Sequence, residues 1–439
     1  MSGDDMDEDR PGHAAIDLRS DFLARPSGAM RAAADAARDS LCFGLREDPW
    51  QRRLEARIAD LLGMEDALVF PTCTMANTTA LMLAAPPGSV VPTQPDAHML
   101  VSEAGAGAAL AGVTLSAVAS NEAERAAGDS AAMPAPSAWD RALGGSPNVQ
   151  RPDVRLAVLE NTHNRGGGVA LPRGYVDDVV AIAARHGARL HLDGSRLFNA
   201  AEALQLPLAA LARGFETVSI SLNKTFGAPI AALLAGSRAS IERALVIRQR
   251  LGGGIRPTGP ASAATLAGLD DTGHLAEVHA LARRLADALA GHPSLVIRQP
   301  ASVTNMVVAA VSPPDTPDAF AARCEAQGLR ILALDGRHVR FVIYRGIDAA
   351  QVGRAIAIVR SIGAARGQID VAGRLRIVNR DLVAELPGRR RRWRAGKTGA
   401  HVGIERDRLA ANSRYGQSAL LCGSLCDGKG ERVKVQQRG

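Results

Sequence analysis

Between residues 155 and 236 the chain alternates short apolar runs with amphipathic segments of helical length. The apolar runs predict strands over 155–160, 188–193 and 217–222, and helices are expected over 175–187 and 206–214. Parallel neighbours in a sheet need a crossover of a dozen or more residues, usually a helix. The alternation therefore predicts an α/β fold with a mostly parallel sheet covered by helices on both faces.

The rest of the chain predicts a domain order around this sheet. Asp48 suits a helix N-cap and Pro49 the first helical position, before a helix that leads to a strand at 67–70. Residues 121–148 interrupt the alternation with a helical or loop excursion. We expect these parts, in order: a disordered leader (1–14), a segment joining the small domain (15–33), a large domain (34–260), a small α+β domain (261–366) and a basic, mostly disordered tail (367–439).

The net charge of +7 has to be divided before it is interpreted. Residues 371–439 carry 16 Lys and Arg against 6 Asp and Glu, so the remainder of the chain has a small negative net charge. Nucleic-acid binding, with the strong salt dependence of phosphate contacts, would therefore use only the tail and its RRRRWR run (389–394). We treat nucleic acid as an unfavoured partner.

The sequence also bounds the compartment. No apolar run reaches the roughly 20 residues that cross a bilayer, and the acidic first residues are unlike a secretory signal. The five cysteines are scattered and odd in number, which favours reduced thiols and a cytoplasmic protein. Cys422 and Cys426 have no second pair, so we expect no metal site.

Three groups of polar residues follow predicted strands, where ligands bind in open parallel sheets. The first is Thr72, Cys73 and Thr74, at the start of a helix. Free N–H groups and the helix dipole there favour a phosphate, and the threonine hydroxyls add donors. A plain helix cap is the alternative interpretation.

The second group is Asp193 and Arg196. Asp193 ends an apolar strand, where a buried carboxylate needs a partner. It could hold a protonated ring nitrogen, and Arg196 could bind an oxyanion. Equally, the two could form an ion pair with each other across a turn.

The third group contains Lys224, the single lysine between Met1 and Gly396; only Lys397, Lys429 and Lys434 follow it. Elsewhere the chain uses arginine for positive charge. Arginine cannot become a neutral nucleophile, whereas lysine can and then forms a Schiff base. A phosphate cradle, a strand-end Asp and a strand-end Lys are together what pyridoxal 5'-phosphate (PLP) requires. The sequence thus predicts a PLP enzyme.

Residues 16–365 resemble the low-specificity threonine aldolases, fold-type-I PLP enzymes of the beta-eliminating lyase/threonine aldolase superfamily. The resemblance is carried in order by IDLRSD (16–21), residues 46–77, LENTHN (159–164), DGSRLFNAA (193–201), SLNKTFGAP (221–229) and GGGIR (252–256). It implies a seven-stranded type of sheet, PLP as the cofactor, an amino-acid substrate, no membrane association, and a homodimer or homotetramer with shared active sites.

The resemblance also implies roles for residues that the pattern alone leaves undecided. His98 would stack on the pyridine ring and His163 would lie near the substrate; either is a candidate base. Arg256 would reach the cofactor phosphate, often from the neighbouring subunit. Arg340 would bind the substrate α-carboxylate, assisted by Ser20. Thr72, Cys73, Thr74, Asp193, Arg196 and Lys224 would hold the cofactor.

The function that we predict is cleavage of a β-hydroxy-α-amino acid to glycine and an aldehyde. The alternative keeps the cofactor and changes the bond: β-elimination, racemisation or transamination. The sequence departs from the family at Cys73, at Phe43 and around the lysine, and residues 21–24 read Asp-Phe-Leu-Ala instead of Asp-Thr-Val-Thr. Ile343 and Tyr344 replace the family's Thr-His pair. Several of these lie where a substrate side chain would sit, so the aldehyde stays open.

Overall fold

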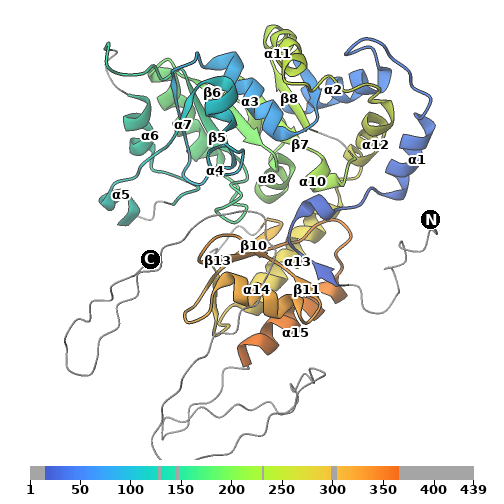
Figure 1. Cartoon of the computed structure of the whole chain (residues 1–439), viewed down its shortest axis with the longest axis vertical. Coiled ribbons are helices and arrows are strands. Elements are labelled where there is room, and N and C mark those ends of the chain that lie inside the picture. The colour runs from blue at the N-terminus through green and yellow to red at the C-terminus, as the bar shows by residue number, and fades with distance from the viewer. Residues whose placement is uncertain (1–14, 127–129, 145–147, 230–231, 298–303, 365–439) are drawn as a thin grey trace, which may run out of the picture. The chain divides into compact units, whose positions relative to one another are not determined.

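The structure is a computed structural model, shown in Figure 1, that describes residues 15–126, 130–144, 148–229, 232–297 and 304–364. The predicted leader and the basic tail, with Cys422 and Cys426, lie outside the described residues. The domain boundaries proposed above stay a prediction.

A seven-stranded sheet forms the centre of the larger part. Its strands stand in the order β2-β8-β7-β6-β5-β3-β4, and β8 runs antiparallel to both of its neighbours while the pairs from β7 to β4 are parallel. The bounds are β2 Asp66–Phe70, β3 Val90–Thr93, β4 Thr114–Ala117, β5 Leu156–Glu160, β6 Arg189–Gly194, β7 Thr217–Ser221 and β8 Ala232–Gly236. The predicted α/β class with a mostly parallel sheet is confirmed, and the three predicted strands match β5, β6 and β7.

Helices cover this sheet, and most precede or follow a strand. Their bounds are α1 Gly28–Ala36, α2 Pro49–Leu62, α3 Cys73–Ala84, α4 His98–Val101, α5 Glu122–Ala126, α6 Pro136–Leu143, α7 Arg173–Arg185, α8 Leu197–Leu204, α9 Leu208–Ala212, α10 Asn223–Phe226, α11 Arg238–Arg250 and α12 Gly259–Leu269. A 3₁₀ turn, η1, spans Asp21–Leu23, and a short π-helix, η2, spans Gly107–Ala111. The predicted cap holds, because Asp48 Oδ1 accepts from the N–H of Trp50 at 2.9 Å.

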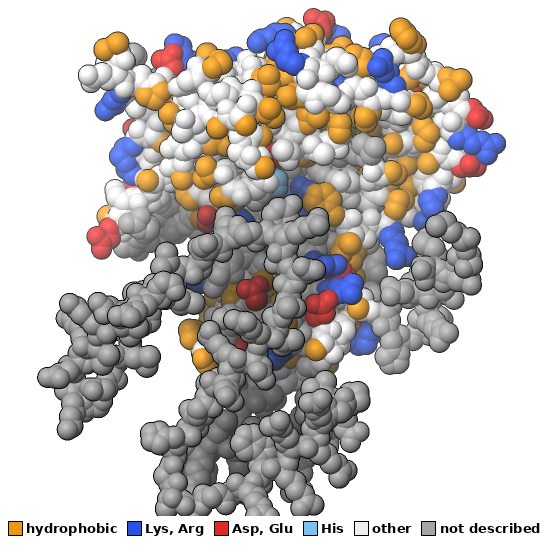
Figure 2. All heavy atoms as spheres, in the orientation of Figure 1, with side chains coloured by type: hydrophobic (Ala, Val, Ile, Leu, Met, Phe, Trp, Pro, Cys, Tyr) orange, Lys and Arg blue, Asp and Glu red, His pale blue; other side chains and the backbone are white. Residues whose placement is uncertain are grey.

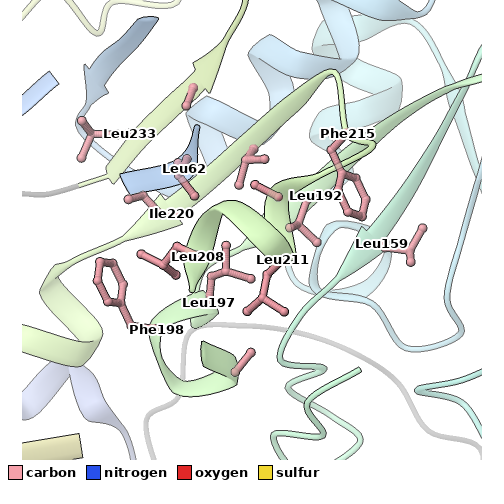
Figure 3. Packing of buried hydrophobic residues seen from close by; sticks show 14 of the residues in the cluster. Leu62, Leu159, Leu192, Leu197, Phe198, Leu208, Leu211, Phe215, Ile220 and Leu233 are labelled. Carbon is pink, nitrogen blue, oxygen red and sulfur yellow. The ribbon is translucent and has the colours of Figure 1, made fainter. Parts of the chain in front are cut away.

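The two faces of the sheet have separate apolar cores. Along β2, Ala67 and Val69 join one cluster, while Leu68 and Phe70 join another with α3 and α11. This is the alternation that a strand buried on both faces requires. Figure 3 shows part of the first cluster, in which Leu192, Leu197, Phe198, Leu211 and Ile220 lie among the labelled side chains.

A second, antiparallel sheet forms the smaller part, with the order β12-β13-β10-β9. Its elements are α13 His274–Leu289, β9 Leu295–Ile297, β10 Met306–Val311, α14 Pro317–Glu325, β12 Leu332–Ala333, β13 His338–Val342 and α15 Ala349–Ala364. Figure 1 shows β10 and β13 with these helices in its lower half. The N-terminal strand β1 (Ile16–Asp17) pairs in parallel with β11 (Leu329–Arg330), and Ile16 and Leu18 are buried in this second core. The N-terminal segment is thereby fixed beside the small sheet.

On the face that Figure 2 displays, neither positive nor negative charge dominates. On the face in Figure 2, Lys and Arg side chains are interspersed with Asp and Glu. Among the described helices, none has both the length and the apolar character that crossing a membrane demands.

Candidate active site

Three parallel strands end at the same edge of the large sheet. In register, Glu160 at the end of β5 pairs with Asp193 on β6, and Asp193 pairs with Ser219 on β7. Lys224 follows β7 directly, on the single-turn helix α10. Because parallel strands share one carboxyl edge, residues 160, 193 and 224 meet there although up to 64 positions separate them in the chain.

Asp193 is a buried, ionised carboxylate. Its Oδ2 accepts from Asn77 Nδ2 at 3.0 Å and its Oδ1 from the N–H of Ser195 at 3.1 Å. Burial alone would raise the pKa of Asp193, but the positive charges of His98 and Lys224 and the hydrogen bond from Ser195 hold it below the ordinary value. The group therefore carries negative charge throughout the neutral range.

His98 begins α4 and is oriented by two acidic side chains. Its Nδ1 lies 2.9 Å from Glu103 Oε1, and its backbone N–H donates to Glu160 Oε2. Burial lowers the pKa of His98, but the hydrogen bond to Glu103 and the charge of Asp193 raise it overall above the ordinary value. Ligand atoms of His98, Glu103 and Asp193 lie within 4.8 Å of one another, close enough for a metal ion, but Glu103 Oε1 already accepts from Asn77 and pairs with His98.

Lys224 is almost fully buried, which is unusual for lysine. Its Nζ lies 5.2 Å from the ring centre of Phe22, which is 59% exposed on η1. The amine is thus buried near an accessible aromatic ring, and its charge interacts with those of Asp193 and Asp21. A lysine held away from solvent does not serve as a surface cation, and its amine acts as a nucleophile when it loses its proton.

The predicted phosphate loop forms the start of α3. Thr72 caps the helix, since its Oγ1 accepts from the N–H of Met75 at 3.1 Å, so the plain-cap interpretation holds for that contact. A hydroxyl that accepts can still donate to a phosphate oxygen. Cys73 turns its thiol inward to the carbonyl of Ile220 at 3.1 Å, and burial raises its pKa to about 11. The thiol therefore stays neutral, and what Cys73 offers an anion is its backbone N–H.

Arg196 does not pair with Asp193 across the turn. It forms a bidentate pair with Asp21, with Nε–Oδ2 and Nη2–Oδ1 distances of 2.7 Å each, and both groups are buried. The alternative of a local Asp193–Arg196 ion pair is thus wrong, because a partner 175 positions earlier has the better geometry. Asn305 adds a third donor to Asp21 at 3.1 Å.

Arg340, which is on β13, lies next to the Arg196–Asp21 pair. Its Nη1 donates to Asn164 Oδ1 at 2.8 Å and its Nη2 to the carbonyl of Arg19 at 3.1 Å. Burial and the neighbouring Arg196 lower the pKa of Arg340 to about 10. Among the residues that the structure describes, its Nε is buried with no hydrogen-bond partner. The positive charge is therefore only partly compensated.

The remaining predicted residues lie in different settings. His163 is fully buried; its Nδ1 accepts from the N–H of Gly166 at 3.0 Å and its Nε2 contacts the carbonyl of Pro95 at 3.0 Å. Ser20 caps η1 through the N–H of Phe22 at 3.3 Å. Arg256 is exposed, and its guanidinium donates to the carbonyl of Phe43 at 2.9 Å.

The sequence reasoning missed the partners that orient these groups. Asn77, Glu103, Asn164 and His191 contact predicted site residues or one another. Asn77 stands among other polar residues of α3, namely Thr74, Thr78 and Thr79, so the sequence alone does not single it out, although it is fully buried.

These groups fit PLP by their chemistry. A buried amine can bond to its aldehyde, a buried ionised carboxylate matches a protonated ring nitrogen, and the N-terminus of the 12-residue helix α3 suits a phosphate. Two buried guanidinium groups with one carboxylate between them suit a second anion.

Comparison with known proteins agrees with this geometry. The beta-eliminating lyase family model matches residues 17–312, which is more than half of the chain. This chain belongs to the beta-eliminating lyase family. The predicted membership is confirmed, and the family makes the chain an enzyme of the carbon–carbon lyase type.

Low-specificity L-threonine aldolases are among the relatives of this beta-eliminating lyase. The chain is 34% identical over 343 residues to low-specificity L-threonine aldolase 1 of Arabidopsis thaliana, covering 77% of this chain and 93% of that one. It is 33% identical over 307 residues to the low specificity L-threonine aldolase of Escherichia coli strain K12, covering 66% and 83%.

Solved structures confirm the fold-type-I architecture. Leishmania major threonine aldolase superposes with a TM-score of 0.65 at 18% identity, covering 79% of this chain and 99% of that one. Sphingomonas wittichii serine palmitoyltransferase gives 0.64 at 17% identity, covering 80% and 88%. At such identities the likeness concerns the fold alone.

Proposed function

We propose that this chain is a PLP-dependent aldolase that cleaves a threonine-like β-hydroxy-α-amino acid into glycine and an aldehyde. The observation that carries the proposal is the set of Lys224, Asp193 and His98 at one sheet edge, in which Lys224 and Asp193 are buried and His98 is partly exposed. The threonine aldolase names of the relatives with about one-third identity support the same reaction.

When bound, PLP supplies an aldehyde for the amine and a ring that accepts the electrons of the broken bond. Lys224 provides the amine that holds it. Asp193 would keep the ring nitrogen protonated, because a fixed negative charge in a buried site strongly favours an adjacent positive charge. Thr72, Cys73 and Thr74 bind the phosphate through the start of α3, with the threonine hydroxyls as further donors.

The substrate carboxylate has a matching charge in this site. Arg196 and Arg340 contribute two positive charges and Asp21 one negative charge, which leaves one for an anion. The unpartnered Nε of Arg340 is a donor for it, and Ser20 begins the turn that holds Asp21. Binding of the carboxylate there fixes the amino acid while its Cα–Cβ bond is broken.

Of the two candidate histidines, the contacts favour His98 as the base that removes the β-hydroxyl proton. Glu103 holds His98 Nδ1, so Nε2 is the nitrogen that gives and takes a proton, and it must be deprotonated for His98 to act as the base. His163 uses both nitrogens, since Nδ1 accepts from Gly166 and Nε2 therefore donates to Pro95. We assign His163 to positioning the 160–168 loop.

Replacement of each histidine separates these roles. We expect His98→Asn to lower kcat by about 10²–10⁴-fold, the usual contribution of a positioned base, with cofactor still bound. His163→Asn should mainly lower the thermal unfolding temperature and raise KM, since Asn keeps one donor and one acceptor. Steady-state kinetics and thermal unfolding of both variants check this; an equal kcat loss in His163→Asn at unchanged KM would contradict it.

The alternative on the same cofactor is β-elimination, racemisation or transamination. Incubation of the PLP-loaded protein with L-threonine, L-allo-threonine and L-serine distinguishes them. We expect acetaldehyde and glycine in equal amounts from the two threonines. Release of a 2-oxo acid as the main product would favour elimination or transamination, and inversion at Cα without an aldehyde would favour racemisation.

We also propose a homodimer, or a tetramer of dimers, in which Arg256 reaches the cofactor phosphate of the neighbouring subunit. In support, Arg256 is exposed and donates to the carbonyl of Phe43, and Leu41 and Phe43, two positions apart, are two large apolar side chains that are 86% and 87% exposed.

Light scattering of the purified chain should give at least twice the monomer mass, and Phe43→Arg should shift it toward monomer with weaker PLP binding. Val149→Arg, which changes another exposed apolar residue, is the matched control. A monomer that binds PLP and turns over normally would contradict the proposal.

We also propose that the protein is cytoplasmic. Cys42, Cys73 and Cys324 are free thiols, as expected in a reducing compartment. Nucleic-acid binding would depend on the tail, which lies outside the described residues, and no contact in the described part favours it.

A further inference from the structure

A single amide connects the residues proposed to contact the cofactor ring. Asn77, fully buried on α3, donates through Nδ2 to Asp193 Oδ2 at 3.0 Å and to Glu103 Oε1 at 3.0 Å. Glu103 in turn holds His98. Asn77 therefore contacts the carboxylate assigned to the ring nitrogen and, through one intermediate, the imidazole assigned to the ring face.

The orientation of this amide is fixed by what surrounds it. Carboxylates can only accept, so Nδ2 must face Asp193 and Glu103 and Oδ1 must face the other way. There Oδ1 accepts from Ser219 Oγ at 2.6 Å and from His191 Nε2 at 3.1 Å. All four hydrogen-bonding positions of the Asn77 side chain are thus used, and the residue is fully buried.

His191 extends the arrangement away from the site. Burial lowers the pKa of His191 to about 4, so the ring is neutral and has one N–H. Because Asn77 Oδ1 can only accept, we place that proton on Nε2, so that Nδ1 accepts from Thr217 Oγ1 at 2.8 Å and makes no hydrogen bond with the Thr217 carbonyl 3.1 Å away. Donors and acceptors run in one direction, from Thr217 through His191 and Asn77 to the carboxylates.

We propose that Asn77 is the positioning residue of the proposed reaction, which holds Asp193 as a carboxylate aimed at the ring nitrogen and Glu103 against His98. This inference rests on the proposed function, because the ring nitrogen belongs to PLP. His98, Lys224 and His191 also face Asp193 with charges or partial charges, but Asn77 is the side chain that gives a hydrogen bond to Asp193 and to Glu103 together.

The hydrogen bond from Asn77 affects the position of one proton, which the ring nitrogen and Asp193 can share. It can reside on the ring nitrogen beside an ionised Asp193, or on Asp193 beside a neutral ring. The Asn77 donor stabilises only the ionised carboxylate, so its removal moves the proton from the ring nitrogen toward Asp193 Oδ2. A hydrogen bond to a charged group contributes roughly tenfold or more to such an equilibrium.

The test uses the full chain loaded with PLP that carries ¹⁵N in its ring. The ¹⁵N chemical shift of the bound ring reports its protonation without any turnover. Asn77→Leu removes both donors at similar size, and Asn77→Ser is measured alongside in case the leucine variant does not fold. Ser219→Ala is the matched control, because it removes a hydrogen bond to Oδ1 of the same amide and leaves both Nδ2 contacts.

We expect the wild type and Ser219→Ala to show a protonated ring nitrogen at neutral pH. In the Asn77 variants the ratio of ring-protonated to neutral forms should fall about tenfold, with a matching loss of kcat. An unchanged ¹⁵N shift in a folded Asn77 variant would overturn the inference, as would an equal change in Ser219→Ala. Failure of the wild type to bind PLP would instead overturn the proposed function, and this inference with it.

Discussion

Lys224→Ala is expected to remove both the visible absorbance of PLP-loaded protein and the aldolase activity, with kcat lowered roughly 10³-fold or more. The variant loses the amine that we propose bonds to the cofactor. It also removes a positive charge that lies near Asp193 and Asp21, so part of any loss could come from the buried carboxylates.

Lys224→Arg separates these two causes. The guanidinium keeps the charge beside the carboxylates but cannot become a neutral nucleophile. We therefore expect the arginine variant to unfold at a temperature closer to that of the wild type and still to lack the absorbance and the turnover. Absorbance spectra, thermal unfolding and aldehyde release measure the three quantities. An arginine variant with normal spectrum and turnover would show that Lys224 supplies only charge.

The second large effect is expected at Asp193. Asp193→Asn keeps the size of the side chain but removes its charge and one of the two oxygens that accept from Asn77 and Ser195, so the ring nitrogen loses the partner that keeps it protonated. Loss of one preorganised electrostatic contact costs about 10²–10³-fold in kcat, and we expect that range here, with weaker PLP binding. Kinetics at saturating PLP separate the two contributions.

Asp193→Glu provides the control because it keeps the charge and displaces it by one methylene. We expect it to recover part of the activity that Asp193→Asn loses. Since the charges of His98 and Lys224 lower the pKa of Asp193 despite burial, the wild type should keep this contribution above the ordinary carboxyl range and lose it only in acid. Equal activity of Asp193→Asn and wild type at pH 7 would contradict the role of the charge.

The strand pattern was sufficient to predict the large sheet but not its full topology. Strands at 155–160, 188–193 and 217–222 are buried on both faces and alternate with helices, which determines both their type and their parallel direction. The antiparallel direction of β8 could not be predicted, because the apolar run Ala232–Gly236 is compatible with either strand direction. The turn through α10 reverses the chain, but its sequence indicates a binding site and not a β-hairpin turn.

The residues of the site likewise divide into those that the sequence could predict and those that it could not. Lys224 and Asp193 could be predicted because each is a polar residue at the end of an apolar strand, and the topology brings strand ends together. The partner of Arg196 could not, because Asp21 comes from the N-terminal segment and pairs across 175 positions. Asn77 was overlooked because the burial of an amide on a helix is visible only once the facing strands are known.

The central claim is that this enzyme breaks a Cα–Cβ bond, and the bond itself can be observed. L-Threonine labelled with ¹³C at both Cα and Cβ gives a ¹³C–¹³C coupling in its NMR spectrum. With the PLP-loaded protein we expect this coupling to disappear as labelled glycine and labelled acetaldehyde form in equal amounts. A product that keeps the coupling, such as a labelled 2-oxo acid, would contradict the account.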